Sequence, residues 1–310
     1  MRIFNGRRAF APERGSFPNG LALAIGNFDG VHKGHQALIA AACAAARAAA
    51  PAVLTFDPHP AHLFAPTLAP PLIVSLERRL ELLATMGVQV TIVEPFDATF
   101  AAIAAEDFVR DVLGRDLDAR EVVVGYDFSF GRDRAGDARM LAERGTALGI
   151  AVTIVPPVSV GGITCSSTKV REFVLEGRVH GASQLLGRPF ELVGTVVRGA
   201  GRGKTLGVPT ANVEPEGELV PRVGIYAGRA LLASGETRAA AISVGTNPQF
   251  GSGGAVSVEA HLLDHGGDLY GQRLRLGFVQ RLRAEQRFAS VEELLAQIQA
   301  DIAETRRIIS

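Results

Sequence analysis

The chain has 310 residues, a length typical of two domains, and 47% of them are hydrophobic, which is enough for two ordinary cores. Lysine plus arginine and aspartate plus glutamate each count 32, and this zero net charge argues against a binder of nucleic acid or of anionic membranes. Two cysteines cannot build a disulfide framework, the N-terminus lacks the apolar segment of a secretory signal, and no apolar run could cross a bilayer, so we expect a soluble cytoplasmic protein.

Short apolar runs alternate with amphipathic stretches in the first half of the chain. The predicted strands are 21–26, 52–56, 90–96, 121–125 and 151–155. The predicted helices are one that ends near residue 49, one over 75–86, one around 106–113 and one over 139–148. Apolar strands that alternate with helices are typical of a parallel sheet covered on both faces. We therefore expect a doubly wound α/β domain.

The pattern changes after Gly187. The strand candidates there are 191–199, 224–233, 237–245, 256–264 and 272–283, and turn signals without a helical period join them. This arrangement favours antiparallel hairpins or a small β-barrel. A final helix is predicted to begin near Ser290. Ser290 can cap it, and the Glu293 side chain can accept in return from the backbone N–H of the cap. The predicted boundary divides the chain into domains 1–187 and 188–310.

The first predicted strand leads into the segment GNFDGVHKGHQ. A glycine-containing loop between a strand and a helix places backbone N–H groups and the positive helix end where a phosphate can bind. His32 and His35 are three residues apart at the helix start, so both can donate to phosphate oxygens from one face. Two other interpretations stay open: a zinc site completed by His59 and His62, or a helix cap at His32 with His35 on the surface.

The H-x-G-H pattern after the first strand resembles the nucleotidylyltransferase superfamily. Three further segments sharpen the resemblance: TFDPHP (55–60), VVGYDFSFG (123–131) and CSSTKVREFVLEGRV (165–179). Together with GNFDGVHKGH they are similar to the FMN adenylyltransferase module of the bifunctional bacterial riboflavin kinase/FAD synthetase family. Because these segments cover nearly the whole first half, the resemblance implies that residues 1–187 form this module.

The resemblance implies that the first domain transfers AMP from ATP to FMN with release of pyrophosphate, by positioning and charge neutralisation. His32 and His35 would stabilise the α-phosphate and the leaving group. For the serine- and threonine-rich motif, an ordinary capped helix remains an alternative, and Phe130 could belong to the core instead of the flavin site. The residues implied to bind ATP and FMN are Gly26, Asn27, Phe28, Asp29, Gly34, Asp57, Asp127, Phe128, Ser167, Thr168 and Arg171.

The second half contains the glycine-rich stretch GAGRGKTLGVPTAN. It is not a Walker motif, because Arg198 occupies the position that needs glycine. Its part TLGVPTANV resembles the riboflavin kinase signature, and further matches extend to the end of the chain. The resemblance implies that residues 188–310 phosphorylate riboflavin with ATP, and that Glu259 is the general base. A solvent-facing strand residue is the alternative for Glu259.

The kinase resemblance also implies a set of ligand-binding residues. Thr210 and Asn212 would organise Mg²⁺ with ATP. The sequence departs from the family pattern at Gln249, Ala260 and His265, none of which removes a catalytic group. The residues implied to bind ATP or the flavin are Gly201, Gly203, Lys204, Gly207, Pro209, Thr210, Asn212 and Arg283.

These observations lead to one hypothesis. A single polypeptide makes FMN and then FAD from riboflavin and two molecules of ATP, with Mg²⁺ as cofactor. The alternatives are an enzyme in which only one activity is live, and a flavin-binding sensor without turnover. No nucleic-acid or membrane partner is expected, and the sequence is compatible with an oligomer.

Overall fold

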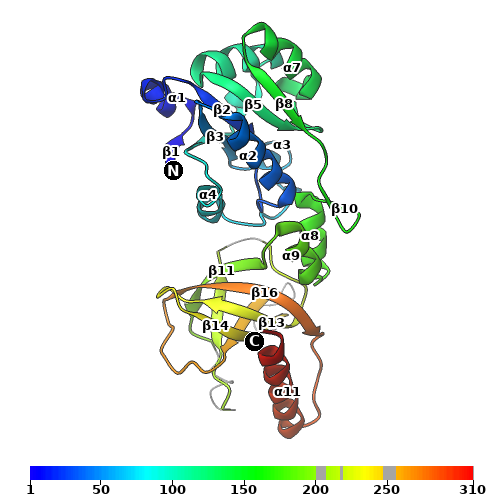
Figure 1. Cartoon of the computed structure of the whole chain (residues 1–310). Helices are drawn as coiled ribbons and strands as arrows, with labels where there is room; N and C mark the ends of the chain where they lie inside the picture. The colour runs from blue at the N-terminus through cyan, green and yellow to red at the C-terminus, as the bar shows by residue number, and fades with distance from the viewer. Residues whose placement is uncertain (200–206, 217–218, 247–255, 310) are drawn as a thin grey trace. The chain divides into compact units, whose positions relative to one another are not determined.

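A computed structural model describes residues 1–199, 207–216, 219–246 and 256–309. The chain divides into two compact units (Figure 1). The first, here called the sheet unit, contains Met1–Pro70 and Leu76–Cys165; the second, the barrel unit, contains Pro71–Ser75 and Ser166–Ser310. Because this division falls at 165/166, the helices between it and Gly187 group with the barrel. The boundary of the two activities near Gly187 remains a prediction.

The sheet unit is built on six parallel strands in the order β1-β4-β3-β2-β5-β8. Their bounds are β1 (Arg2–Asn5), β2 (Leu21–Ile25), β3 (Ala50–Asp57), β4 (Val90–Pro95), β5 (Ala119–Gly125) and β8 (Ala151–Val155). β2 lies inside the sheet, and all five of its residues are buried. The doubly wound parallel sheet that the sequence predicts is thus confirmed.

Helices connect these strands. The bounds are α1 (Arg7–Phe10), η1 (Ala11–Ser16), α2 (Lys33–Ala45), α3 (Pro60–Phe64), α4 (Leu76–Ala84), α5 (Ala98–Ala101), α6 (Ala105–Asp107), the π-helix η2 (Phe108–Asp116), η3 (Arg132–Arg134) and α7 (Ala138–Ala147). Short two-stranded ladders are formed by β6 (Ser129–Phe130) with β7 (Gly136–Asp137) and by β9 (Ser159–Val160) with β10 (Ile163–Thr164).

Several predicted bounds were wrong. α2 ends at Ala45 instead of near residue 49, and β3 begins at Ala50. The predicted helix around 106–113 is split between α6 and η2 and continues to Asp116. β1 was missed because RIFN is short and mixes exposed polar with apolar residues, a pattern that carries little period-2 signal.

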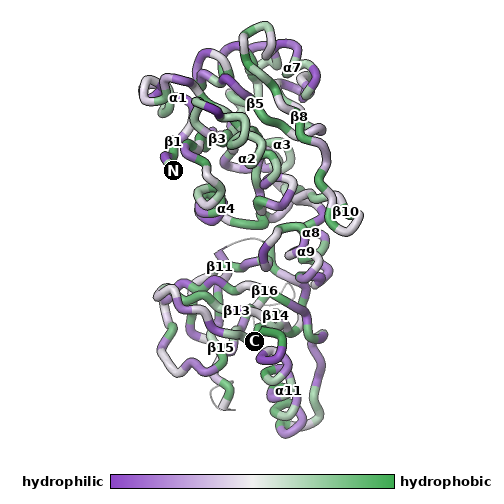
Figure 2. Tube along the Cα trace, viewed as in Figure 1, coloured by the Kyte–Doolittle hydropathy of each residue, from purple (hydrophilic) through white to green (hydrophobic). Residues whose placement is uncertain are grey.

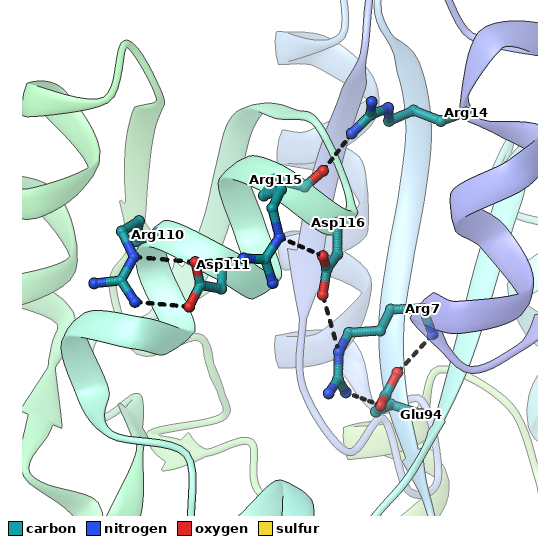
Figure 3. Close-up of polar contacts among 7 residues, drawn as sticks. All are labelled: Arg7, Arg14, Glu94, Arg110, Asp111, Arg115 and Asp116. Carbon is teal, nitrogen blue, oxygen red and sulfur yellow. Dashed lines mark hydrogen bonds and ion pairs between the residues drawn. The ribbon is translucent and has the colours of Figure 1, made fainter.

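A polar network fastens the N-terminal segment to the sheet (Figure 3). The Arg7 guanidinium contacts the carboxylates of Glu94 at the end of β4 and of Asp116 at the end of η2, and the Arg7 backbone N–H donates to Glu94 Oε2 at 2.7 Å. Arg14 donates to the backbone carbonyl of Arg115. Burial raises the pKa of Glu94, although the contacts of Arg7 lower it. The first seventeen residues are therefore anchored by charge as well as by packing.

The barrel unit contains a closed antiparallel barrel in the order β11-β12-β15-β14-β13-β16. Its strands are β11 (Phe190–Val197), β12 (Ala211–Pro215), β13 (Gly224–Leu231), β14 (Thr237–Thr246), β15 (Val256–Leu262) and β16 (Arg273–Arg283). The predicted barrel is confirmed. The missed strand, β12, lies in TLGVPTANV, where proline and asparagine obscure the strand pattern.

The described residues of the barrel unit include the helices α8 (Ser167–Leu175), α9 (Val179–Leu186) and α11 (Val291–Ile309). α9 packs against β11 and β16, while α11 packs against β13 and β14. Hydrophobic and hydrophilic residues alternate along α11 (Figure 2), as the amphipathic prediction requires. Ser290 Oγ accepts from the N–H of Glu293 at 3.2 Å, and Glu293 reciprocates at the N–H of Ala289 at 3.0 Å.

Candidate active sites

The predicted nucleotide segments of the sheet unit follow three adjacent strands. GNFDGVHKGH follows β2, DPHP follows β3, and YDFSFG follows β5, while the sheet order places β2 between β3 and β5. In a parallel sheet the carboxyl ends of neighbouring strands meet at one edge, and a change in the direction of strand order opens a crevice there. The topology therefore gathers these segments at one edge of the sheet.

The loop after β2 has an unusual backbone. Phe28 and Val31 have φ of 50° and 43°, in the left-handed region that a β-branched valine rarely adopts, and Gly30 has φ of 80°. Phe28 and Val31 are buried in the core together with the carboxylate-bearing Asp29, which is 0% exposed. Core packing therefore holds the loop in a strained conformation that turns the chain sharply into α2, as is frequent at functional sites.

His32 and His35 come together at the start of α2. His32 is the N-cap, and its Nδ1 accepts from the N–H of His35 at 3.3 Å. The two rings stack with their centroids 3.7 Å apart and an angle of 18° between their planes. A Cβ on Gly34 would lie 3.0 Å from Cε1 of His32, so glycine there makes room for the stack. His32 therefore caps α2 and stacks on His35 at the same time.

The zinc alternative is not supported. Among the described residues, which include all four of the histidines proposed for it, no group of three or more His, Cys, Asp or Glu side chains could hold a metal ion. His59 instead caps α3, with Nδ1 accepting from the N–H of Ala61 at 3.2 Å. Its Nε2 lies 3.3 Å from Nδ2 of Asn27, which links the segments that follow β2 and β3.

The remaining predicted residues of this edge differ in burial. Asp57 is half-buried at the end of β3, whereas Asp127 is exposed just after β5. Phe128 is partly buried and stacks on Phe130 with the centroids 5.5 Å apart. Phe130 is only 6% exposed and packs with Phe108 in the core, so the core interpretation of Phe130 is correct.

The serine- and threonine-rich motif forms the start of α8 in the barrel unit. Its N-cap is Ser166, whose Oγ accepts from the N–H of Lys169 at 3.2 Å; sequence reasoning did not single out Ser166. Ser167 and Thr168 occupy the first turn. The buried Arg171 donates from Nε to the carbonyl of Pro71 at 2.7 Å. The capped-helix interpretation therefore describes the local structure, and Ser167 and Thr168 lie at the helix end where an anion is favoured.

The barrel unit brings Thr210 and Glu259 together. Thr210 Oγ1 donates to Glu259 Oε2 at 3.0 Å, and Asn212 pairs with Glu259 across the β12–β15 ladder. The neighbours Val258 and Ala260 are buried inside the barrel, so Glu259 points outward, as strand alternation predicts. It nevertheless does not face open solvent, because it lines a cavity of about 280 Å³ that α11 helps to enclose.

Apolar and polar residues both line this cavity. The polar lining includes Thr210, Glu259, His261 and Arg283, and the apolar lining includes Val208, Ile225, Ile242, Phe288, Leu294 and Ile298. Such a combination is typical of a small-molecule site. His261 Nδ1 lies 2.8 Å from the carbonyl of Pro209, which fixes the segment that precedes Thr210.

Arg283 has a structural partner in this cavity. Its Nε and Nη2 bind the carboxylate of Asp301 on α11, at 3.0 Å to Oδ1 and 2.7 Å to Oδ2. Gln297 also donates to Asp301 Oδ1 at 3.0 Å. Sequence reasoning missed Asp301, although its place on the apolar face of an amphipathic helix was a signal. Gly207, with φ of 75°, is exposed, while Gly201, Gly203, Lys204 and Gln249 lie outside the described residues.

Two family models match this chain, one in each half. A family model described as FAD synthetase matches residues 15–169, and one described as riboflavin kinase matches residues 186–309. A bifunctional riboflavin kinase/FMN adenylyltransferase of Escherichia coli K12 is 38% identical over 284 residues, covering 91% of this chain and 90% of that protein. The chain belongs to this bifunctional family.

Other members and one solved structure extend the match. The relative from Pseudomonas fluorescens is 36% identical and covers 99% of this chain and 98% of its own length; that from Bacillus subtilis is 32% identical over 93% and 92%. A crystal structure described as a macrolide-efflux protein from Streptococcus pneumoniae is 30% identical, covers 98% of both chains and has a TM-score of 0.85. In the described part of this chain, every helix is too short or too polar to cross a membrane.

Proposed function

We propose that this chain makes FAD from riboflavin in two steps, with one reaction in each resembling half. The barrel unit phosphorylates riboflavin to FMN, and the FAD synthetase half adenylylates FMN. The observation that carries the proposal is the contact of Thr210 with Glu259 in the wall of the cavity, in a chain that matches both family models. A flavin-binding sensor would need neither this carboxylate nor the stacked histidine pair.

In the kinase step, the 5′-hydroxyl oxygen of riboflavin attacks the γ-phosphorus of ATP. The bond between that phosphorus and the β–γ bridging oxygen breaks, ADP leaves, and the hydroxyl proton passes to the Glu259 carboxylate. Thr210 orients this carboxylate by donating to Oε2 and leaves Oε1 for the substrate. The apolar cavity walls would hold the isoalloxazine ring, with Arg283 in the lining of the same cavity.

Mg²⁺ fits the oxygen donors of this site. Asn212 on β12 pairs with Glu259 on β15, and Thr210 just before β12 contacts Glu259. Hard oxygen ligands of the kind that these three side chains carry suit the ion. We propose that Thr210 and Asn212 hold it with ATP, where its charge offsets that of the phosphates. Gly201, Gly203, Lys204, Gly207 and Pro209 are proposed to surround the nucleotide.

In the adenylyl transfer, an FMN phosphate oxygen attacks the α-phosphorus of ATP. The bond to the α–β bridging oxygen breaks, and pyrophosphate leaves. His32 and His35 are proposed to donate hydrogen bonds to the α-phosphate and the leaving group, because their stacked rings lie together at the start of α2. The flavin and nucleotide are proposed to contact Asn27, Asp57, Asp127 and Phe128, and the triphosphate to contact Ser167, Thr168 and Arg171. We place both reactions in the cytoplasm, where Cys43 and Cys165, which form no disulfide, stay reduced.

Two substitutions separate the reactions. With purified protein, riboflavin, ATP and Mg²⁺, chromatography over time should show FMN and then FAD. Glu259→Gln should lower FMN formation at least about a hundredfold and leave the conversion of added FMN to FAD unchanged. His35→Ala should do the reverse, lowering FAD formation about a hundredfold while FMN accumulates.

The results also test the alternatives. Wild-type protein that forms neither product is not this enzyme, and FMN without FAD would restrict the function to the kinase. Undiminished FMN formation by Glu259→Gln would remove Glu259 as the base. Undiminished FAD formation by His35→Ala would remove this histidine from the mechanism.

A further inference from the structure

Arg79, on α4, is the largest of the fully buried side chains of the described chain, with 0% exposure. A guanidinium keeps its charge in proteins, and placing a charge in a core costs free energy unless partners compensate. Apolar residues of similar volume are often as stable or more stable at such positions. Stability alone therefore does not account for an arginine here.

The hydrogen bonds of Arg79 lead to the candidate adenylyltransferase site. Nη1 donates to Thr55 Oγ1 at 3.1 Å and to the carbonyl of Phe56 at 3.1 Å. The Thr55 hydroxyl donates in turn to the carbonyl of Asn27 at 3.0 Å. One guanidinium thus connects the end of β3, which carries Asp57, with the loop after β2, which leads to His32.

The charges around Arg79 point to the same site. Burial lowers the pKa of Arg79, and the negative charges of the fully buried Asp29 and of Asp57 lie close enough to oppose that fall. Nε and Nη2 of Arg79 have no hydrogen-bond partner within the described residues. The guanidinium therefore does not form one exclusive ion pair. Its charge lies near the carboxylates of both Asp29 and Asp57, which flank the candidate site.

We propose that Arg79 is a positioning residue for adenylyl transfer: through Thr55 and Phe56 it fixes the loop after β2 against the end of β3. Arg79 is too deeply buried to contact a substrate, so it acts on the reaction through the segments that carry Asn27 and Asp57. Errors of about 1 Å in such segments can slow a reaction about a hundredfold. This inference rests on the proposed adenylyltransferase activity.

Steady-state kinetics of FAD formation from FMN and ATP test it in the full-length protein. Arg79→Met, which fills similar space without charge or donors, should lower kcat at least about tenfold and change KM for ATP less than about threefold. Arg79→Lys should restore part of kcat, because the ammonium keeps the charge and one donor. Arg139→Met is the matched control, since Arg139 is exposed on α7 of the same unit, and it should behave as wild type.

A double-mutant cycle keeps the test decisive if Arg79→Met does not fold. Thr55→Val removes the bridging hydroxyl and should lower kcat about threefold or more, and in Arg79→Lys/Thr55→Val the two losses should not multiply. Kinase activity of each variant reports on the barrel unit, and thermal unfolding reports on the sheet unit. A kcat within twofold of wild type for Arg79→Met, or multiplicative losses in the cycle, would overturn the proposal. Wild-type protein without FAD formation would refute the proposed function instead.

Discussion

At the scale of single residues, charged side chains inside the sheet unit pair with one another. The Arg7 guanidinium bridges Glu94 and Asp116, so that the short edge strand β1 and the helices after it are held to β4 and η2 (Figure 3). Glu94 is only 5% exposed, and burial is the largest influence on its pKa, which it raises. A carboxylate that is desolvated this far and yet paired makes the stability of the N-terminal segment sensitive to pH.

Glu94 gives a prediction with a defined sign. Because its pKa is raised in the folded protein, its carboxyl binds a proton more tightly in the folded than in the unfolded chain, and its contribution to stability is fully present below the unfolded pKa. That contribution is lost as pH rises through the folded pKa. Glu94→Gln mimics the protonated acid at every pH. We therefore expect the stability of wild type relative to Glu94→Gln to fall as the pH rises from about 4 upwards.

Urea unfolding of both proteins at a series of pH values measures this difference, and groups that titrate alike in the two proteins cancel. Glu106→Gln is a suitable control, because Glu106 forms an exposed ion pair with Arg144. A stability difference that instead grows with pH would show that the contacts of Arg7, and not burial, dominate at Glu94.

At the scale of elements, α11 forms part of the cavity that we propose as the kinase site. It supplies one apolar wall, and the Arg283–Asp301 ion pair ties that wall to β16. Asp301 is 7% exposed, and removing its charge leaves the positive charge of Arg283 without its ion-pair partner. We expect Asp301→Asn to destabilise the barrel unit by about 3 kcal/mol. We also expect KM for riboflavin to rise roughly tenfold, because α11 loosens.

Thermal unfolding and kinase kinetics check both effects of Asp301→Asn. Glu304→Gln is the control on the same helix, since Glu304 pairs with Arg307 at the surface and such pairs contribute little. An unchanged KM for riboflavin would mean that α11 does not form part of the flavin site.

The elements also show what a sequence reveals. Fully apolar strands such as β2 and the capping pair of α11 are strong local signals, and both were predicted. β12 was missed because Pro209 just before it and Asn212 within it are signals of a loop, whereas the strand forms by pairing with β11 and β15. The spacing of His32 and His35 predicted that they share one face, but not that their rings stack. Arg79 and Asp301 were not predicted, because the partners of a buried charge lie far away in sequence.

At the scale of the whole molecule, the helices α8 and α9 belong to the same compact unit as the barrel. α9 packs against β11 and β16, and the N–H of Arg222 donates to the carbonyl of Val174 at 3.3 Å. Phe173, Val174 and Leu185 of these helices are buried. Removing them would expose this apolar surface and leave part of the barrel uncovered.

A truncation experiment follows from this arrangement. Residues 166–310 should fold and phosphorylate riboflavin, whereas residues 188–310 should unfold at a temperature about 10 °C lower or aggregate, because the buried faces of α8 and α9 are lost. Calorimetry and kinase assays of the two fragments measure this. Equal stability of both fragments would show that the barrel does not depend on these helices.

The boundary between the two compact units, at 165/166, also affects how the two activities could be separated into two proteins. The FAD synthetase match ends at residue 169, inside α8, yet α8 belongs to the compact unit of the kinase. A single cut at 165/166 would therefore leave residues 166–169 of the FAD synthetase match on the product that carries the barrel. A single cut after residue 169 would instead divide α8, so no one cut keeps both the FAD synthetase match and the barrel unit whole.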